Sequence, residues 1–229
     1  MELSRPLSVI TPTLDGDVLR VLALADVDFT SGDIHRLLDG PSIRGIHNTL
    51  GRLTEQGIVG RRPAGRANLY RLNREHLAAP YVIGLARLRD ELLDRLGSEV
   101  RSWPAPPLIG ALFGSAARRD HSPHSDIDIL LVRPDDASDD IWDDPTDSLS
   151  ALVTAWTGND CRTLTFTQSQ VQDRGAGEPA LEDVVREGIA FHGDLQWLAT
   201  PVKGRSAARS RGRKKSSRPF GRASAPPSS

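Results

Sequence analysis

The sequence WPAPP at residues 103–107 constrains the fold of this chain more than any other segment. Each proline lacks a backbone N–H and clashes with the preceding helical turn, so no helix runs through the segment. The chain has 229 residues, which is enough for two ordinary domains. We therefore expect a boundary here. The predicted organisation is a first domain over residues 1–74, a connecting helix over 75–103, a second domain over 104–200 and a tail over 201–229.

Charge is distributed unevenly between these regions. Residues 1–103 hold 14 basic and 13 acidic side chains, residues 104–200 hold 6 and 17, and residues 201–229 hold 9 and none. The tail is also rich in Ser, Ala and Pro, a composition that buries too little apolar surface to offset chain entropy. We therefore expect residues 201–229 to be disordered, and to bind either nucleic acid or the acidic second domain.

Three features favour a soluble protein of the cytoplasm. Cys161 is the single cysteine, so the chain has no internal disulfide framework and suits a reducing compartment. No run of about 18 apolar residues is present to span a membrane. The first residues lack the sustained apolar stretch of a signal peptide. We expect a cytoplasmic location and no membrane partner.

Residues 14–72 show the pattern of three helices followed by a hairpin. The apolar positions of these helices are Val18, Leu19, Leu22 and Leu24, then Ile34, Leu37 and Leu38, and then Ile43, Ile46, Leu50 and Leu53. Thr30 and Asp33 are spaced as in a capping box at the start of the second helix. Gly40-Pro41 is expected to end that helix and start the third, with proline in its first turn. Two short strands around Pro63-Ala64-Gly65 complete the unit.

The polar face of the third helix predicts DNA binding. It carries Arg44, Asn48 and Arg52, and such side chains pair with guanine and adenine edges in the major groove. The hairpin carries Arg61, Arg62 and Arg66, which suit phosphates beside the groove. Residues 34–74 hold 8 basic and 2 acidic side chains. Residues 14–72 resemble the winged helix-turn-helix family, which implies binding of double-stranded DNA; an ordinary solvated face or a dimerisation module is the alternative.

Residues 75–101 are expected to form one long helix. Its apolar stripe is Tyr81, Leu85, Leu88, Leu92 and Leu96. At this spacing the stripe forms one face, which serves either as a core contact or as the seam of a homodimer. We expect this helix to connect the two domains rigidly.

The second domain begins with two strands that carry polar residues at one end. Residues 108–113 form an apolar run that leads directly into Gly114-Ser115, where glycine allows close approach of a phosphate and the hydroxyl adds a donor. In residues 125–132 the side chains of Asp126 and Asp128 alternate with isoleucines, so both carboxylates share one face. Two carboxylates about 6.5–7 Å apart along a strand can share divalent cations.

Gly114-Ser115 followed by Asp126-Ile127-Asp128 resembles the signature of the polymerase-beta-like nucleotidyltransferases, and especially their minimal bacterial members. The resemblance covers residues 105–195. It implies a mixed sheet with flanking helices, and so an α+β fold for the chain. It also implies a nucleoside triphosphate and Mg²⁺ in a one- or two-metal site. The residues that it assigns are Asp126 and Asp128 to catalysis and metal binding, and Gly114, Ser115, Arg118, Arg119 and Ser125 to the nucleotide.

Two departures from this pattern affect the expected chemistry. Arg119 stands where many relatives have glycine, and either binds phosphate or lies on the surface. The third carboxylate that the family supplies from a later strand is missing from residues 161–166, the expected strand, which offers Thr163 and Thr165 instead. Asp160 is a weak substitute. Because a general base contributes ~10²–10⁴-fold in rate, we expect nucleotide binding with slow or absent transfer.

Seven aspartates between residues 135 and 147 are expected to form a solvated acidic loop, since they lack the spacing of a calcium-binding loop.

Three functions remain open from the sequence. The chain is a nucleotidyltransferase acting on an unknown hydroxyl acceptor, a transcription regulator whose second domain only binds nucleotide or protein, or half of a toxin–antitoxin pair with a cognate partner protein.

Overall fold

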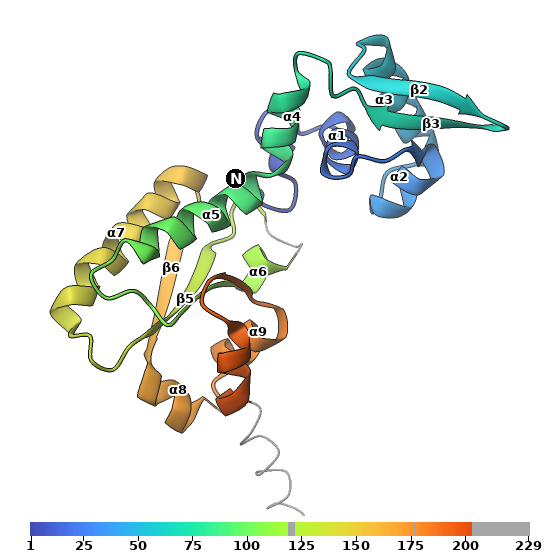
Figure 1. The fold of residues 1–229 in the computed structure, drawn as a ribbon. Coiled ribbons are helices and arrows are strands. Elements are labelled where there is room, and N and C mark those ends of the chain that lie inside the picture. The colour runs from blue at the N-terminus through green and yellow to red at the C-terminus, as the bar shows by residue number, and fades with distance from the viewer. Residues whose placement is uncertain (119–121, 176, 203–229) are drawn as a thin grey trace, which may run out of the picture.

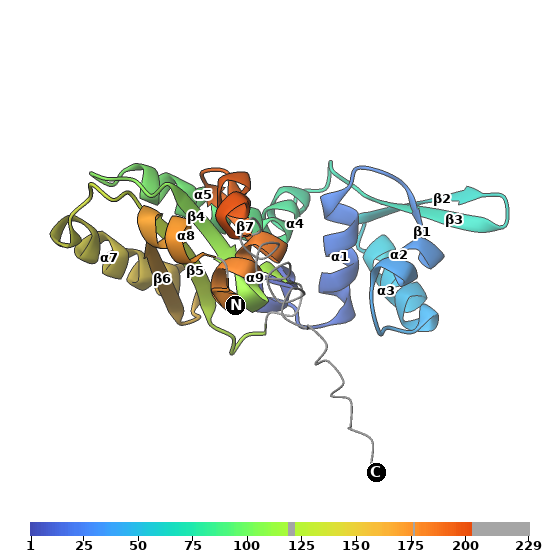
Figure 2. The same cartoon turned by 90° about the horizontal axis from the view of Figure 1, so that it is seen from below.

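The computed structural model describes residues 1–118, 122–175 and 177–202. Arg119 and the basic tail from residue 203 onward lie outside the described residues. The chain forms two units that lie side by side (Figure 1). Seen from below, the first unit ends in a protruding hairpin and the second holds a larger sheet between helices (Figure 2). No helix of the described residues is long and apolar enough to cross a bilayer.

The first unit contains short helices and a small antiparallel sheet in the order β1-β3-β2. Gly65 has a φ of +61° and forms the hairpin turn between β2 and β3, a conformation that favours glycine. The elements are η1 (Pro6–Val9), α1 (Leu14–Leu24), β1 (Phe29–Thr30), α2 (Ser31–Leu37), α3 (Ile43–Glu55), β2 (Val59–Ala64) and β3 (Ala67–Leu72).

The capping box predicted for α2 is confirmed. The Thr30 hydroxyl accepts a hydrogen bond from the Asp33 backbone N–H at 3.1 Å, and the Thr30 backbone N–H donates to Asp33 at 2.8 Å. The start of α3 differs from the prediction. Ser42 caps this helix by accepting from the Gly45 N–H, so Pro41 lies before the cap and outside the first turn.

The apolar face of α3 packs in the first core largely as its spacing predicts. Ile46, Leu50 and Leu53 are buried there together with the α1 residues Val18 and Leu22. Ile43 is 43% exposed, which contradicts its predicted place on the buried face. It is the first residue of the helix, and the next turn makes the first contact with the core.

The prediction of a single connecting helix over residues 75–101 is wrong. Two helices replace it, α4 (Ala79–Ala86) and α5 (Leu88–Arg101), with a break at Arg87, whose φ and ψ are −102° and 11°. The break follows from packing, because α4 buries Ala86 in the first core while α5 buries Leu92 and Leu96 in the second. Tyr81 is 76% exposed and does not join the predicted stripe.

The second unit is built on a mixed four-stranded sheet in the order β6-β5-β4-β7. Strands β5 and β6 are parallel, and the other two pairs are antiparallel. The predicted α+β class with a mixed sheet is therefore confirmed. The elements are β4 (Ile109–Phe113), α6 (Gly114–Ala117), β5 (Ile127–Arg133), α7 (Asp139–Thr157), β6 (Cys161–Thr167), α8 (Gln168–Arg174), α9 (Pro179–Glu187) and β7 (Ile189–His192).

Helices cover both faces of this sheet (Figure 1). Ile127, Ile129 and Leu131 of β5 pack with α5 and α7, while Leu130 and Val132 pack with α8 and α9. Helical conformation continues over residues 195–202, and Val202 is buried in this second layer. Residues 201 and 202, which composition assigns to the tail, are thus part of this helix.

The acidic segment after β5 is helical from Asp139, which corrects the prediction of a loop. Trp142, Leu149 and Val153 recur at helical spacing and are buried against the sheet. The five aspartates within the helix, Asp139, Asp140, Asp143, Asp144 and Asp147, are exposed to solvent. The charge run is therefore the solvated face of an amphipathic helix.

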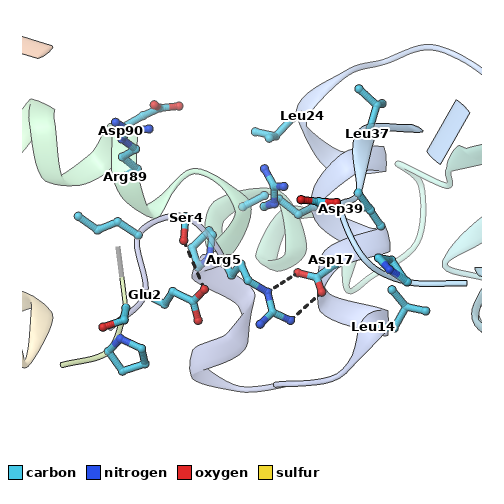
Figure 3. A pocket seen from close by; sticks show the side chains of 18 residues that line it. Glu2, Ser4, Arg5, Leu14, Asp17, Leu24, Leu37, Asp39, Arg89 and Asp90 are labelled. Atoms are coloured by element: carbon cyan, nitrogen blue, oxygen red, sulfur yellow. Dashed lines mark hydrogen bonds and ion pairs between the residues drawn. The ribbon is translucent and has the colours of Figure 1, made fainter. Parts of the chain in front are cut away.

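The N-terminal segment joins the two units. Leu3 is buried in the second core and Leu7 in the first. Arg5 donates to both carboxylate oxygens of Asp17 on α1, at 2.9 and 2.7 Å, beside a hollow of about 970 Å³ at the junction (Figure 3). The lining of this hollow carries charges of both signs, and Asp126 and Asp128 do not contribute to it.

The two cores are expected to respond separately to cavities. Ile46→Ala and Leu149→Ala each remove a fully buried side chain, so each should lower the free energy of unfolding by about 2–5 kcal/mol. Hydrogen exchange should show lost protection over α1–β3 for Ile46→Ala and over β4–β7 for Leu149→Ala. Leu77→Ala, at an exposed position, serves as control. Equal loss of protection in both units for either variant would contradict separate cores.

Candidate active site

The turn after β4 lies directly against a carboxylate of β5. Phe113 pairs with Asp128 in the antiparallel register of the two strands, and Gly114 follows at once. Gly114 has a φ of +64°, and a Cβ at this position would lie 2.6 Å from Asp128 Oδ2. Glycine is therefore required twice, by the backbone conformation and by the space.

Ser115 follows in a helix of a single turn. Its side chain is half-buried, and its hydroxyl makes no hydrogen bond to any residue that the structure describes. Because α6 spans only Gly114–Ala117, its dipole contributes little to anion binding. The donors at this turn are the backbone N–H groups and the Ser115 hydroxyl.

Asp126 and Asp128 form the acidic part of the site. Asp126 immediately precedes β5 and Asp128 is its second residue, so alternation places both on the face that packs with α8 and α9. Burial raises the pKa of Asp128 above its usual value, and the Asp126 charge raises it further. Arg162 and Arg118 oppose this rise in the pKa. The half-buried pair therefore favours a nearby cation.

Arg162 supplies one such cation. The parallel register of β5 and β6 places it beside Asp128. Its guanidinium Nη2 lies 2.7 Å from Asp126 Oδ2, with the Arg162 side chain 74% exposed and that of Asp126 27% exposed. Sequence reasoning missed this residue, because its place beside the carboxylates depends on the register between two strands.

Thr163 and Thr165 lie on the face of the sheet opposite to the one that carries Asp126 and Asp128. Thr163 pairs with Ile129, and its hydroxyl is hydrogen-bonded to that of Ser150 on α7 at 2.8 Å. Asp160 precedes β6 and is exposed, and its backbone carbonyl accepts from the Ile127 N–H. Among the described residues, no cluster of three or more His, Cys, Asp or Glu could hold a metal ion.

Two carboxylates without a third can still hold a magnesium ion whose other ligands come from substrate and water. Mg²⁺ is commonly held by one or two carboxylates, with phosphate oxygens of the substrate and waters completing its octahedron. Asp126 and Asp128 match this donor set, and the backbone of the Gly114 turn lies beside them. The residues therefore suit an ion that arrives together with a triphosphate.

The other predicted nucleotide ligands are placed differently from one another. Arg118 is near enough to affect Asp128, and its guanidinium donates to Glu187 of α9 at 2.5 Å. The Ser125 hydroxyl accepts from the Ser122 backbone N–H at 3.1 Å, so it shapes the turn before Asp126. Arg119 lies outside the described residues.

Asn159 positions the segment that leads to Asp126. It is 3% exposed, and its side-chain amide donates to the carbonyls of Pro123 and Ser125, both at 3.0 Å. A buried amide with these partners fixes the approach of the chain to β5. The sequence offers no signal for this role, since an asparagine after glycine is typical of any loop.

The predicted DNA contacts lie on α3 and on the hairpin of the first unit. Arg44 and Asn48 of α3 are exposed, as are Arg61 and Arg66 of the hairpin, and no ion pair joins these arginines to other described residues. The remaining two predicted DNA contacts, Arg52 and Arg62, form ion pairs with aspartates. Arg52 donates to both carboxylate oxygens of Asp15 at 2.8 Å, and Arg62 donates to Asp28 at 2.6 Å.

Comparison with known proteins gives one family match. Residues 102–173 match the family model of the nucleotidyltransferase domain. No curated protein matches the chain.

Several solved structures are similar to part of the chain. A toxin–antitoxin structure with AMP-PNP is 18% identical with a TM-score of 0.39, over 54% of this chain and 90% of that one. A tri-AMPylated Shewanella oneidensis HEPN toxin in complex with MNT antitoxin is 17% identical with a TM-score of 0.37, over 55% and 92%. The toxin–antitoxin MntA-HepT is 16% identical with a TM-score of 0.34, over 56% and 91%. TM-scores below 0.5 do not establish a common fold.

The family match extends from the end of α5 to α8 and includes the Gly114 turn, Asp126 and Asp128. Of these, Gly114 and Asp128 are in direct contact across two paired strands. Residues 102–173 are therefore similar to the nucleotidyltransferase domain family.

Proposed function

We propose that the second unit binds a nucleoside triphosphate with Mg²⁺ and transfers its nucleotidyl group to a hydroxyl acceptor. The observation that carries this proposal is the contact between the Gly114 turn and Asp128, where a Cβ would meet the carboxylate at 2.6 Å. A phosphate cradle and a pair of acidic oxygens thus meet at one point. The family match over residues 102–173 supports the same reaction class.

Each residue has a defined part in this proposal. The backbone at Gly114 and the Ser115 hydroxyl donate to the triphosphate, and Arg118, held by Glu187, adds positive charge beside it. Asp126 and Asp128 hold the magnesium ion. When bound, that ion neutralises charge on the phosphates and aligns the leaving group.

Among the described residues, none is an evident base for the acceptor hydroxyl. Thr163 and Thr165 face α7, and Asp160 joins no cluster of possible metal ligands among the described residues. A positioned base contributes ~10²–10⁴-fold in rate. Nucleotide binding with slow transfer is therefore the expected behaviour.

Nucleotide binding should depend on the carboxylate pair. The double variant Asp126→Asn with Asp128→Asn should lose Mg²⁺-dependent ATP binding in titration calorimetry, because the metal loses both charged ligands. Gly114→Ala should also lose it, since the new Cβ would collide with Asp128. Asp144→Asn, on the exposed face of α7, is the matched control. Wild-type affinity in the double variant would refute the proposed site.

We also propose that the first unit binds double-stranded DNA as a winged helix-turn-helix. The exposed Arg44 and Asn48 on α3 favour this function, with Arg61 and Arg66 on the hairpin that follows. Arginine and asparagine on a helix suit base edges in the major groove, and the hairpin arginines suit phosphates. Arg52 and Arg62 must leave Asp15 and Asp28 to reach DNA, so their contributions should be smaller.

DNA binding can be measured by fluorescence anisotropy on the duplex upstream of the gene and on a scrambled duplex. Arg44→Ala and Asn48→Ala should each cost ~1–3 kcal/mol on the specific duplex only. Arg61→Ala should weaken binding to both duplexes and flatten the salt dependence. Arg95→Ala, on α5 of the second unit, is the control. Unchanged affinity after combined replacement of Arg44, Asn48 and Arg52 would exclude the assignment.

A further inference from the structure

Arg162 holds a position at the site that the family pattern leaves unexplained. It is level with Asp128 on the neighbouring parallel strand, and its guanidinium contacts Asp126 at 2.7 Å. The side chain therefore contacts one carboxylate of the pair from the strand that would have to supply a third acid. A cation stands where an anion would complete a second metal site.

We propose that Arg162 acts as a resident cation of the Asp126–Asp128 pair, in place of a second divalent ion. The site would then accept only the metal ion that arrives with the nucleoside triphosphate. This inference rests on the proposed function, because it concerns how the same site is loaded.

The charges around the pair favour this arrangement. Among the described residues, the acids are Asp126, Asp128 and Glu187, and the cations that contact or influence them are Arg162 and Arg118. Glu187 engages Arg118 at 2.5 Å, and Arg162 contacts Asp126 at 2.7 Å. A free divalent ion entering the pair would meet the guanidinium charge and an Asp126 oxygen that already accepts a hydrogen bond.

The exposure of Arg162 explains how a loaded nucleotide still enters. With 74% of its side chain in solvent, Arg162 forms an ion pair of the weak, screened kind. The guanidinium is therefore free to turn from Asp126 to an arriving phosphate, which it can bind through two N–H groups. A metal–triphosphate complex carries negative phosphates that can replace Asp126 as the partner of Arg162. A bare metal ion offers the guanidinium no such partner.

The first test measures Mn²⁺ binding to the full chain without nucleotide, by electron paramagnetic resonance. Arg162→Gln should bind Mn²⁺ at least about ten-fold more tightly than wild type, because one positive charge beside the ion is removed. Arg162→Lys should keep the low affinity of wild type. Arg36→Gln removes an arginine that is also 74% exposed and ion-paired, with Asp33 of α2, and should change nothing. Equal Mn²⁺ affinity in wild type and Arg162→Gln would overturn the inference.

The second test needs no variant and counts ions in wild type. With saturating α,β-methylene ATP, which cannot release pyrophosphate, one Mn²⁺ should be bound for each nucleotide. Two ions for each nucleotide would overturn the inference. Failure of the proposed function has a different signature: wild type would not bind the analogue at all, while the nucleotide-free titration of Arg162→Gln would still report on the role of Arg162.

Discussion

The antiparallel pairing of Phe113 with Asp128 is the contact on which the site in the second unit depends. It brings the end of one strand beside the acidic start of the next, so that the turn at Gly114 lies against a carboxylate with no space for a side chain. The apolar residues that precede Phe113 on β4 and follow Asp128 on β5 anchor this pairing in the hydrophobic clusters on the two faces of the sheet. Close packing thus fixes the distance between the backbone donors and the acidic oxygens.

Charge compensation shapes the rest of this region. Burial makes ionisation of Asp128 costly, and the adjacent Asp126 adds to that cost. Two arginines from different elements offset it, Arg162 from β6 and Arg118 from the turn after α6. Asn159 contributes through position alone, because its buried amide holds the backbone that leads into Asp126. The site is therefore assembled from residues far apart in the sequence.

Local patterns predicted much of the secondary structure. The capping box at Thr30 is present, and the strands over residues 109–113, 127–133 and 161–167 lie within two residues of their predicted bounds. The errors arose where tertiary packing decides the outcome. The break at Arg87 exists because α4 and α5 belong to different cores. The acidic run at residues 139–147 is helical because its sparse apolar residues are buried by the sheet.

The sequence by itself determined which groups can do chemistry here, a glycine-serine turn and two carboxylates that alternation places on one face of a strand. Alternation within a strand follows from its backbone geometry, so local sequence is enough. Only the tertiary structure decided which residue of β6 lies beside them. A shift of one residue in the register would exchange Arg162 for Thr163 and remove this positive charge from beside the two aspartates. That register is set by the packing of the hydrophobic clusters on the two faces of the sheet, which no local pattern encodes.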